Sequence, residues 1–204
     1  MVWWILLSSV IGYLLGSINT SLIVGKLFYK TDVREHGSGN AGATNTLRTL
    51  GKGAAIWVVV GDLLKGVIAC LIGRYLAGEL IPGVYAGEYL AGMFAVLGHN
   101  WPIYFGFKGG KGVLTSFAVV LMFSPLAALL CLVGFIVIVA LTRYVSLGSI
   151  VCAILFPIIA FSFGEPMLLV LVGAFLALLI VFRHGANIQR LLAGNEKKLS
   201  FKKS

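Results

Sequence analysis

Long apolar runs dominate this chain and constrain its fold more than any other feature. Of its 204 residues, 59% are hydrophobic and 11% are charged, whereas soluble domains carry about 25% charged residues. A membrane-spanning helix needs about 20 residues, a length that only the first two runs reach comfortably. The chain is therefore expected to be an all-α integral membrane protein with seven transmembrane helices, several of them short. The runs are roughly Trp3–Leu27, Ala54–Leu76, Val84–Leu97, Val113–Phe123, Leu126–Leu141, Ile150–Phe163 and Met167–Phe182.

Positive charge is distributed unevenly among the loops between these runs. If each run crosses the membrane once, then of the 16 Lys and Arg residues Arg74 falls alone on one side and Lys65 lies within a run, which leaves 14 on the other side. Cytoplasmic loops carry such an excess, so the N-terminus is expected outside and the C-terminus in the cytoplasm. A turn at Ser124-Pro125 must separate the fourth and fifth runs, because merging them would destroy this split. Residues 1–204 are expected to form a single membrane-embedded domain with a short basic cytoplasmic tail at about 195–204.

Small residues recur at four-residue spacing in two places. Gly12 and Gly16 form one pair, and Gly83 and Gly87 form the other. This small-xxx-small spacing lets helix backbones approach closely in membranes. Both pairs are therefore predicted to pack against neighbouring helices.

Charged residues are rare inside the runs, and Asp62 and Lys65 lie three residues apart in the second one. Charges in a span usually face the interior and pair, so we interpret these two as a local ion pair that orients its helix. Carboxylates are few on the basic side, and a magnesium site of the kind that nucleotide-driven phosphoryl transfer needs is not expected. No metal or cofactor is expected, and the sequence contains no nucleic-acid-binding motif.

A glycine–lysine segment lies between the third and fourth runs, with the sequence Phe105-Gly106-Phe107-Lys108-Gly109-Gly110-Lys111-Gly112. Glycine lets the backbone approach a ligand closely, and successive N–H groups form an anion-binding concavity. Lysine adds a mobile positive charge. The segment therefore predicts a site that holds phosphate. It differs from a Walker A loop, because Lys111 precedes Gly112 and not Ser or Thr. The alternative is a flexible basic loop that touches lipid head groups.

A second polar segment, Asp32–Asn45, is rich in glycine, hydroxyl and amide groups and is followed by Arg48. Such groups can hydrogen-bond a polyol or a phosphate and can hold a loop in shape. A simple linker is the alternative. The candidate binding residues here are Ser38, Asn40, Thr44, Asn45 and Arg48.

Three further polar segments fall on the same side of the predicted membrane. His99 leads into the glycine–lysine segment. Ser146 lies in Thr142–Ser149, where capping of the next helix is the alternative role. In Arg183–Glu196, the side chains of His184 and Asn187 share one face if the segment is helical.

Together these segments predict one polar, basic pocket at the cytoplasmic face. Lys111, Lys108 and Arg48 would supply positive charge, while Ser38, Ser146 and the glycine amides would supply neutral donors. The unperturbed pKa of histidine lies near neutrality, and His184 is the histidine placed among these groups. Such a pocket suits a small phosphorylated molecule that meets a lipidic one.

In combination, these motifs closely resemble the bacterial acyl-phosphate:glycerol-3-phosphate acyltransferases, the PlsY family. The resemblance covers essentially the whole chain, in order and with short gaps. The residues that carry it are Gly37–Asn45; Gly98-His99 with Phe107–Gly112; Arg143–Ser146; and Arg183-His184 with Asn187-Ile188 and Arg190-Leu191.

The resemblance implies a multi-pass enzyme of the bacterial (inner) membrane whose active site faces the cytoplasm. It would transfer an acyl group from acyl phosphate to the 1-hydroxyl of glycerol 3-phosphate, giving lysophosphatidic acid and phosphate in phospholipid biosynthesis. Glycerol-phosphate acyltransferases that use acyl-CoA or acyl carrier protein carry a His-x4-Asp motif. The residues five positions after His36, His99 and His184 are Ala41, Tyr104 and Gln189, so that motif is absent.

The residues and the resemblance together give two sets of candidate site residues and no metal ligand. The predicted catalytic residues are His184, Asn187, Lys111 and Ser146. The predicted substrate-binding residues are Ser38, Asn40, Thr44, Asn45, Arg48, His99, Lys108, Gly109, Gly110 and Gly112.

Two questions stay open at this point. His184 either removes the hydroxyl proton as a base or only orients the substrate, while the substrate's own phosphate accepts the proton. A small membrane transporter or binding protein for a phosphorylated metabolite is the alternative function, although no inverted repeat supports it. A lipid-binding scaffold is a third possibility.

Overall fold

The structure, a computed structural model, describes residues 1–199. In that part of the chain the regular secondary structure is helical, apart from an isolated bridge between Ile81 and Val84. The chain divides into two compact units, one formed by Met1–Val119 (unit 1) and one that begins at Val120 (unit 2). The chain passes from one to the other within α6 (Val113–Phe123). The prediction of a single domain stays a prediction, and the predicted basic tail lies partly outside the described residues.

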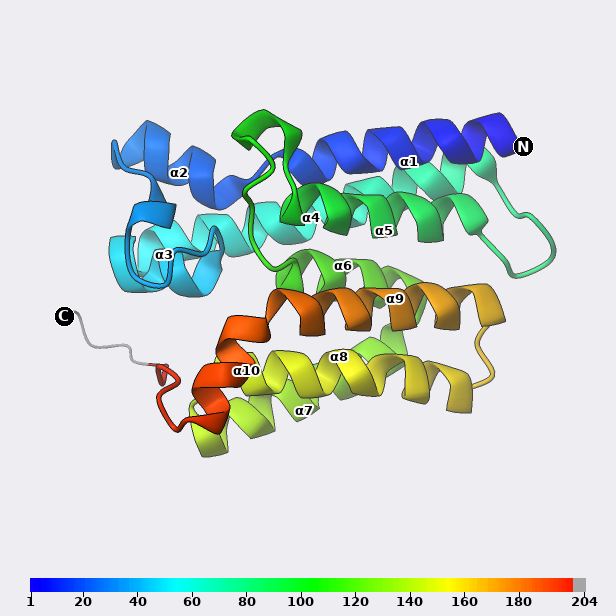
Figure 1. The fold of residues 1–204 in the computed structure, drawn as a ribbon. Helices are drawn as coiled ribbons and strands as arrows, with labels where there is room; N and C mark the ends of the chain where they lie inside the picture. The colour runs from blue at the N-terminus through cyan, green and yellow to red at the C-terminus, as the bar shows by residue number, and fades with distance from the viewer. Residues whose placement is uncertain (200–204) are drawn as a thin grey trace. The chain divides into compact units, whose positions relative to one another are not determined.

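Unit 1 is built around three apolar helices, α1, α4 and α5, which pack against one another (Figure 1). The shorter α2 and α3 pack on α4. The polar segments of unit 1 lie in the connections that follow α2 and α5. In chain order the elements are α1 (Val2–Ser17), α2 (Thr20–Phe28), the 3-10 turn η1 (Val33–Glu35), α3 (Ala43–Leu50), α4 (Lys52–Ala77), α5 (Ala86–Asn100), the 3-10 turn η2 (Ile103–Phe105) and the start of α6.

The first glycine pair lies at the contact between α1 and α5. A side chain at Gly12 would overlap the backbone carbonyl of Ala91, and one at Gly16 would overlap that of Ala95. Glycine is required here because the two helix backbones touch. The predicted packing role of this pair is confirmed.

In the second glycine pair, the predicted packing role holds for one residue and fails for the other. A side chain at Gly87, on α5, would overlap the backbone of Gly73 on α4, so its packing role is also confirmed. Gly83 lies before α5 with φ of 79° and has open space around it, so the prediction is wrong for this residue. Positive φ, and not helix packing, accounts for glycine there.

The first apolar run is helical but is interrupted after Ser17. The backbone of Ile18 leaves the helical conformation, and the buried side chain of Asn19 accepts a hydrogen bond of 3.1 Å from the amide of Leu22, which caps α2. Asparagine is favoured at this position because its side chain replaces a missing backbone partner. The interruption leaves the Ile18 carbonyl available to a side chain of α4.

Unit 2 contains α7 (Pro125–Thr142), α8 (Val145–Ser162), α9 (Met167–Arg183) and the short α10 (Gly185–Leu192). Figure 1 shows the first three as a group of long helices, and α8 packs against both α7 and α9. The predicted turn is present, with Pro125 in the first turn of α7, where its missing N–H is not needed. Large apolar side chains such as Leu126 and Val133 are exposed, as expected for a surface that contacts lipid.

Each of the seven predicted apolar runs is helical, yet their lengths differ. Four helical segments are long and apolar enough to cross a membrane, and a fifth is added if α9 and α10, bent by 61°, form one span. The remaining two runs form α5 and α6, of 15 and 11 residues. The count of seven crossings and the orientation therefore stay predictions.

Candidate active site

The glycine–lysine loop of unit 1 is fixed to the end of α5. The amide of Gly109 donates to the carbonyl of Asn100 at 3.2 Å, and the amide of Gly110 donates to the carbonyl of His99 at 3.1 Å. These carbonyls end a helix and lack partners within it. The expectation that successive amides of this loop face an anion is therefore wrong for these two glycines.

Close contact explains why the loop needs glycine. A side chain at Gly109 would overlap the carbonyl of His99, and one at Gly110 would overlap the His99 ring and the carbonyl of Ala41. Gly112 has φ of 77°, and a side chain there would lie 2.8 Å from Oδ1 of Asn100. The predicted binding role of these glycines stays a prediction that rests on the shape of the loop.

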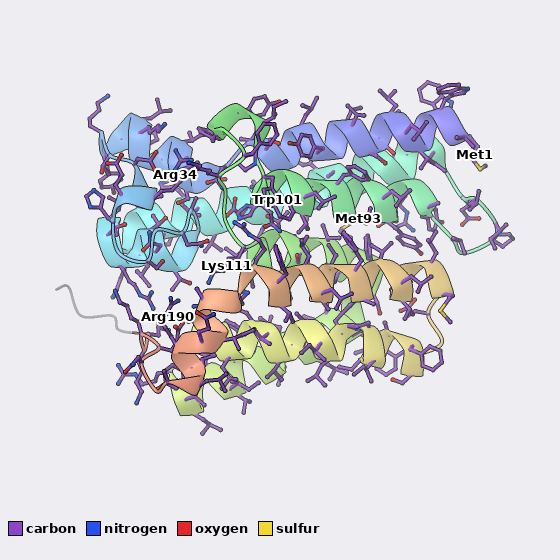
Figure 2. All side chains as sticks on the ribbon, in the orientation of Figure 1. Met1, Arg34, Met93, Trp101, Lys111 and Arg190 are labelled. Carbon is purple, nitrogen blue, oxygen red and sulfur yellow. The ribbon has the colours of Figure 1, made fainter. Side chains whose placement is uncertain are left out.

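Arg34 supports the loop from the other side and was not singled out by the sequence. Its Nη1 donates to the carbonyls of Phe105, at 3.2 Å, and Lys108, at 2.9 Å. The same guanidinium forms a two-point ion pair with Asp32, with Nη2 to Oδ2 at 2.6 Å (Arg34 is labelled in Figure 2). These bonds from Arg34 hold the pKa of Asp32 below its usual range.

Asn45 organises the second polar segment. Its Oδ1 accepts from the amide of Ser38 at 2.8 Å, and its Nδ2 donates to the carbonyls of Val33, at 2.8 Å, and His36, at 3.1 Å. The side chain is 1% exposed. The observed bonds of Asn45 thus hold the loop in shape, and its predicted contact with substrate stays a prediction.

The other predicted binding residues of unit 1 differ in exposure. Ser38 and Lys108 are exposed, and Asn40, Thr44, Arg48 and Lys111 are half-buried. The hydroxyls of Ser38 and Thr44 bond no residue in the described part of the chain. These two are therefore available to a ligand. Figure 2 labels Lys111 on the loop that precedes α6.

The predicted ion pair inside α4 is present, and His99 joins it. The Nζ atom of Lys65 lies 2.8 Å from Oδ1 of Asp62 and 2.9 Å from Nδ1 of His99. All three residues are buried, with 5% or less of the surface of each exposed. Nδ1 of His99 is therefore engaged in a hydrogen bond with Lys65 inside unit 1.

In unit 2, the carboxylate of Glu196 connects three side chains. Its Oε1 accepts from Oγ of Ser146 at 2.8 Å and from Nδ2 of Asn187 at 2.6 Å, and its Oε2 accepts from Nε of Arg190 at 2.8 Å. Ser146 begins α8 and Asn187 lies on α10, so the structure brings these two predicted residues to one partner. Figure 2 labels Arg190 on α10.

The environment of Glu196 favours its charged form. Burial by itself would raise its pKa, but hydrogen bonds from Asn187, Arg190 and Ser146 outweigh burial and lower the pKa. Because Ser146 donates its hydroxyl proton to this carboxylate, it can only accept from a further partner, contrary to its expected role as a donor. Glu196 was missed, although it is the sole acidic residue after Glu165 in an otherwise basic terminus.

His184 lies where α9 ends and α10 begins, and it is 3% exposed. Its Nδ1 lies 2.8 Å from the carbonyl oxygen of Ile180, which can only accept, so Nδ1 carries a proton, and in the neutral ring Nε2 carries the lone pair. The His184 carbonyl accepts from the amide of Asn187 at 2.8 Å. The bend thus places the two predicted catalytic residues one turn apart.

Known proteins resemble the chain over nearly its whole length. The model of the family described as "Glycerol-3-phosphate acyltransferase" matches residues 6–194. A glycerol-3-phosphate acyltransferase of Thermoanaerobacter pseudethanolicus is 46% identical over 196 residues, which cover 96% of each chain. One from Halalkalibacterium halodurans is 48% identical over 205 residues, which cover 98% of this chain and 97% of the other.

Solved structures show the same similarity. The glycerol 3-phosphate form of PlsY, an integral membrane glycerol 3-phosphate acyltransferase, matches with a TM-score of 0.89 and 39% identity over 96% of both chains. The lysophosphatidic acid form of PlsY matches with a TM-score of 0.86 and 38% identity over 97% of this chain and 96% of the other. The chain therefore belongs to the glycerol-3-phosphate acyltransferase family of integral membrane enzymes.

Proposed function

We propose that this chain transfers an acyl group from acyl phosphate to the 1-hydroxyl of glycerol 3-phosphate. The products are 1-acyl-glycerol 3-phosphate, which is lysophosphatidic acid, and inorganic phosphate, so the reaction contributes to phospholipid biosynthesis. The observation that carries this function is the similarity over 96% of the chain or more to PlsY in its glycerol 3-phosphate and lysophosphatidic acid forms. Those two ligands are the acceptor and the product of the proposed reaction.

The chemistry is an acyl transfer from one oxygen to another. The 1-hydroxyl oxygen attacks the acyl carbonyl carbon and forms the new ester bond. The bond from that carbon to the phosphate oxygen breaks, phosphate leaves with this oxygen, and a phosphate oxygen takes the hydroxyl proton. Because phosphate is a good leaving group, strong acid catalysis is not needed.

The main physical obstacle is that both substrates are anions. Two unit charges about 4 Å apart repel by about 1 kcal/mol in water and by several times more in a low-dielectric site. We assign Lys111 and Arg48, both half-buried, to offset this repulsion, with Lys108 as a more exposed contributor. Ser38, Asn40 and Thr44 are assigned to the glycerol phosphate, and the glycine–lysine loop provides the backbone shape that admits a phosphate group.

We assign His184 and Asn187 to the acceptor hydroxyl. The lone pair on Nε2 of His184 suits acceptance of a hydrogen bond from that hydroxyl, because Nδ1 donates to Ile180. We assign His184 an orienting role, with substrate phosphate as the proton acceptor, since positioning alone can supply much of an acyl-transfer rate. Ser146 is held in its rotamer by Glu196.

We also assign the chain seven membrane crossings, an external N-terminus and an active site that faces the cytoplasm of a bacterial (inner) membrane. The uneven distribution of Lys and Arg supports this orientation, because 14 of the 16 fall on one side when each apolar run crosses once. Cysteine-accessibility labelling in intact cells tests it, with the glycine–lysine loop and the Arg183–Asn187 region expected to be shielded from an external reagent.

The function is tested with detergent-purified protein, acyl phosphate and glycerol 3-phosphate. Phosphate release is expected only when both substrates are present, with one lysophosphatidic acid formed per phosphate, and acyl-CoA should not replace acyl phosphate. A transporter or binding protein would bind glycerol 3-phosphate without releasing phosphate. A lipid-binding scaffold would show no turnover, and Lys111→Ala would have little effect on it.

The role of His184 is tested separately by the pH dependence of kcat. Protonation removes the lone pair in either role, so the two roles are separated by how much activity His184→Gln keeps: an orienting histidine can be replaced by another neutral acceptor, and kcat should then stay within about tenfold of wild type without a titration near the pKa of histidine. If His184→Gln loses nearly all of kcat together with that titration, then His184 acts as the base.

A further inference from the structure

Three ionisable side chains of unit 1, those of Asp62, Lys65 and His99, form a buried group that the proposed chemistry does not use. Lys65 reaches three acceptors with its ammonium group: Oδ1 of Asp62 at 2.8 Å, Nδ1 of His99 at 2.9 Å and the carbonyl of Ile18 at 3.1 Å. An ammonium group has three N–H donors. All three donors are therefore satisfied, and the arrangement leaves Lys65 no freedom to turn elsewhere.

This bonding fixes the tautomer of His99. Lys65 can only donate, so Nδ1 of His99 must accept and the ring proton must lie on Nε2. Asp62 lies against the ammonium group as its counter-charge, and it is itself held by Thr20 Oγ1, which donates to its Oδ1 at 3.2 Å. The orientation of the His99 ring is thus set by charges on α4, although His99 belongs to α5.

The opposite edge of the same ring faces the glycine–lysine loop. A side chain at Gly110 would overlap Nε2 of His99, so the ring lies directly against the backbone of Gly110. The amide of Gly110 also donates to the carbonyl of His99 at 3.1 Å. His99 therefore supports the loop with both its ring and its backbone.

Stability alone does not account for this arrangement. A buried ion pair is often no more stabilising than apolar residues of the same volume, because both charges lose their hydration. Asp62 and Lys65, however, hold the His99 ring against the loop through a hydrogen bond, which an apolar pair could not form. Lys65 supplies a directional donor to the histidine ring, and a methylene chain has none.

We propose that Asp62 and Lys65 are positioning residues, which hold the His99 ring against Gly110 and thereby keep the glycine–lysine loop in the shape that binds substrate phosphate. The inference rests on the proposed function for the identity of the substrate. It assigns no contact with substrate to Asp62 or Lys65. It also gives His99 a supporting role in place of direct binding.

The test compares two double variants that differ in one donor. Asp62→Asn with Lys65→Met removes both charges and the donor to Nδ1, whereas Asp62→Asn with Lys65→Gln removes both charges but keeps an N–H donor. Hydrogen exchange of the Gly109 and Gly110 amides is measured without substrate. Exchange is expected to accelerate about tenfold or more in the Met variant and to stay within about threefold of wild type in the Gln variant.

Kinetics supplies the second readout. In the Met variant kcat/KM for glycerol 3-phosphate is expected to fall by up to about 100-fold, mainly through KM, because the loop no longer holds the phosphate in place. The Gln variant should recover most of this loss. Equal loop exchange and equal KM in the two double variants would overturn the inference.

A matched control uses an ion pair that joins α4 and α5 at another place. Arg74 on α4 lies 3.7 Å from Glu88 on α5, and Arg74→Met with Glu88→Gln removes it. This variant should leave loop exchange and KM within about twofold of wild type. If the Met variant does not fold, His99→Leu, which keeps the Asp62–Lys65 pair and removes the ring contact, must show the same rise in loop exchange, and normal exchange there contradicts the inference.

The two proposals fail separately. The exchange measurement needs no substrate, so a wrong substrate assignment would abolish the kinetic readout and leave the difference in loop exchange. Unchanged exchange in a protein that still releases phosphate from acyl phosphate would remove the positioning role and leave the proposed function.

Discussion

The polar residues of unit 1 and those of unit 2 are held in place in different ways. In unit 1 the glycine–lysine loop is fixed by two backbone bonds to the end of α5, by the guanidinium of Arg34 and by contact with the His99 ring. In unit 2 a single carboxylate, that of Glu196, holds both Ser146 and Asn187. The loop in unit 1 is thus supported by backbone and side-chain groups together, whereas in unit 2 one carboxylate is a shared partner of two predicted catalytic residues.

The two units should therefore differ in how strongly the loss of one supporting side chain lowers activity. Loss of the Arg34 guanidinium in unit 1 leaves the backbone bonds of the loop and its contact with the His99 ring in place. Loss of Glu196 removes a hydrogen bond from two predicted catalytic residues at once.

The largest loss is expected in unit 2, at His184 and Asn187. His184→Ala and Asn187→Ala should each lower kcat by about 100-fold or more, because the acceptor hydroxyl loses the groups that orient it. The measurement is phosphate release under saturating substrates. Ser162→Ala, at the exposed end of α8, is the control and should keep wild-type activity. Turnover within about threefold of wild type in both site variants would remove these residues from the site.

In unit 1, the two lysines of the loop should contribute unequally to the binding of glycerol 3-phosphate. Lys111 is half-buried and Lys108 is exposed, so a charge-assisted bond from Lys111 is worth more, about 1.5–3 kcal/mol. Lys111→Met is expected to raise KM for glycerol 3-phosphate about 10- to 100-fold, and Lys108→Met no more than about threefold. Equal increases in KM for the two variants would show that side-chain exposure does not determine how much each lysine contributes to binding.

Gly110→Ala tests the close contact between the loop and α5. Its side chain would overlap the His99 ring and the Ala41 carbonyl, so overpacking is expected to cost about 1–3 kcal/mol of unfolding free energy. Gly185→Ala is the matched control, because open space surrounds Gly185. Thermal unfolding in detergent measures both, and an unchanged midpoint for Gly110→Ala would contradict the contact.

Replacing one supporting side chain in each unit tests the contrast directly. Glu196→Gln keeps the shape but weakens three charge-assisted bonds, each by about 1 kcal/mol, and kcat should fall about tenfold. Arg34→Met should lower kcat/KM only about threefold, because the backbone bonds of the loop remain. A larger loss in Arg34→Met than in Glu196→Gln would reverse the proposed difference between the units.

The smallest effect concerns pH. Because the pKa of Glu196 is lowered in the folded protein from its ordinary value of 4.5, its stabilising contribution is fully present above that value. It is lost as the pH falls through the lower, folded pKa. Unfolding measured from pH 6 down to about pH 3 should therefore show a steeper loss of stability in wild type than in Glu196→Gln. Parallel curves would show that Glu196 does not contribute.

Local patterns in the sequence predicted much of the fold. Apolar runs became helices because they are long and continuously apolar, and α8 stays helical even across Pro157. The four-residue spacing of Gly12 and Gly16 indicated a close helix contact that the structure contains. The pairing of Asp62 with Lys65 was also predictable, because the two lie one helical turn apart. The interruption at Asn19 was not predicted because the polar residues Ser17, Asn19, Thr20 and Ser21 were counted within one apolar run.

The sequence could not predict contacts between distant residues. Arg34 reaches carbonyls 71 and 74 positions away, and Ser146 meets a carboxylate 50 positions away. The amides of Gly109 and Gly110 looked available to an anion, yet α5 uses them, because the unpaired carbonyls at a helix end compete for the same donors. Exposure of Ser38 and burial of His99 likewise follow from packing and not from residue type.

The central claim is that polar residues of both units serve one acyl transfer. It is tested most directly by phosphate and lysophosphatidic acid release from the purified wild type, Lys111→Met and His184→Ala, each with acyl phosphate in the presence and absence of glycerol 3-phosphate. The account predicts equal amounts of both products in wild type, dependence on glycerol 3-phosphate, and a large loss in each variant while thermal unfolding stays unchanged. Product release without glycerol 3-phosphate, or full activity in either variant, would contradict it.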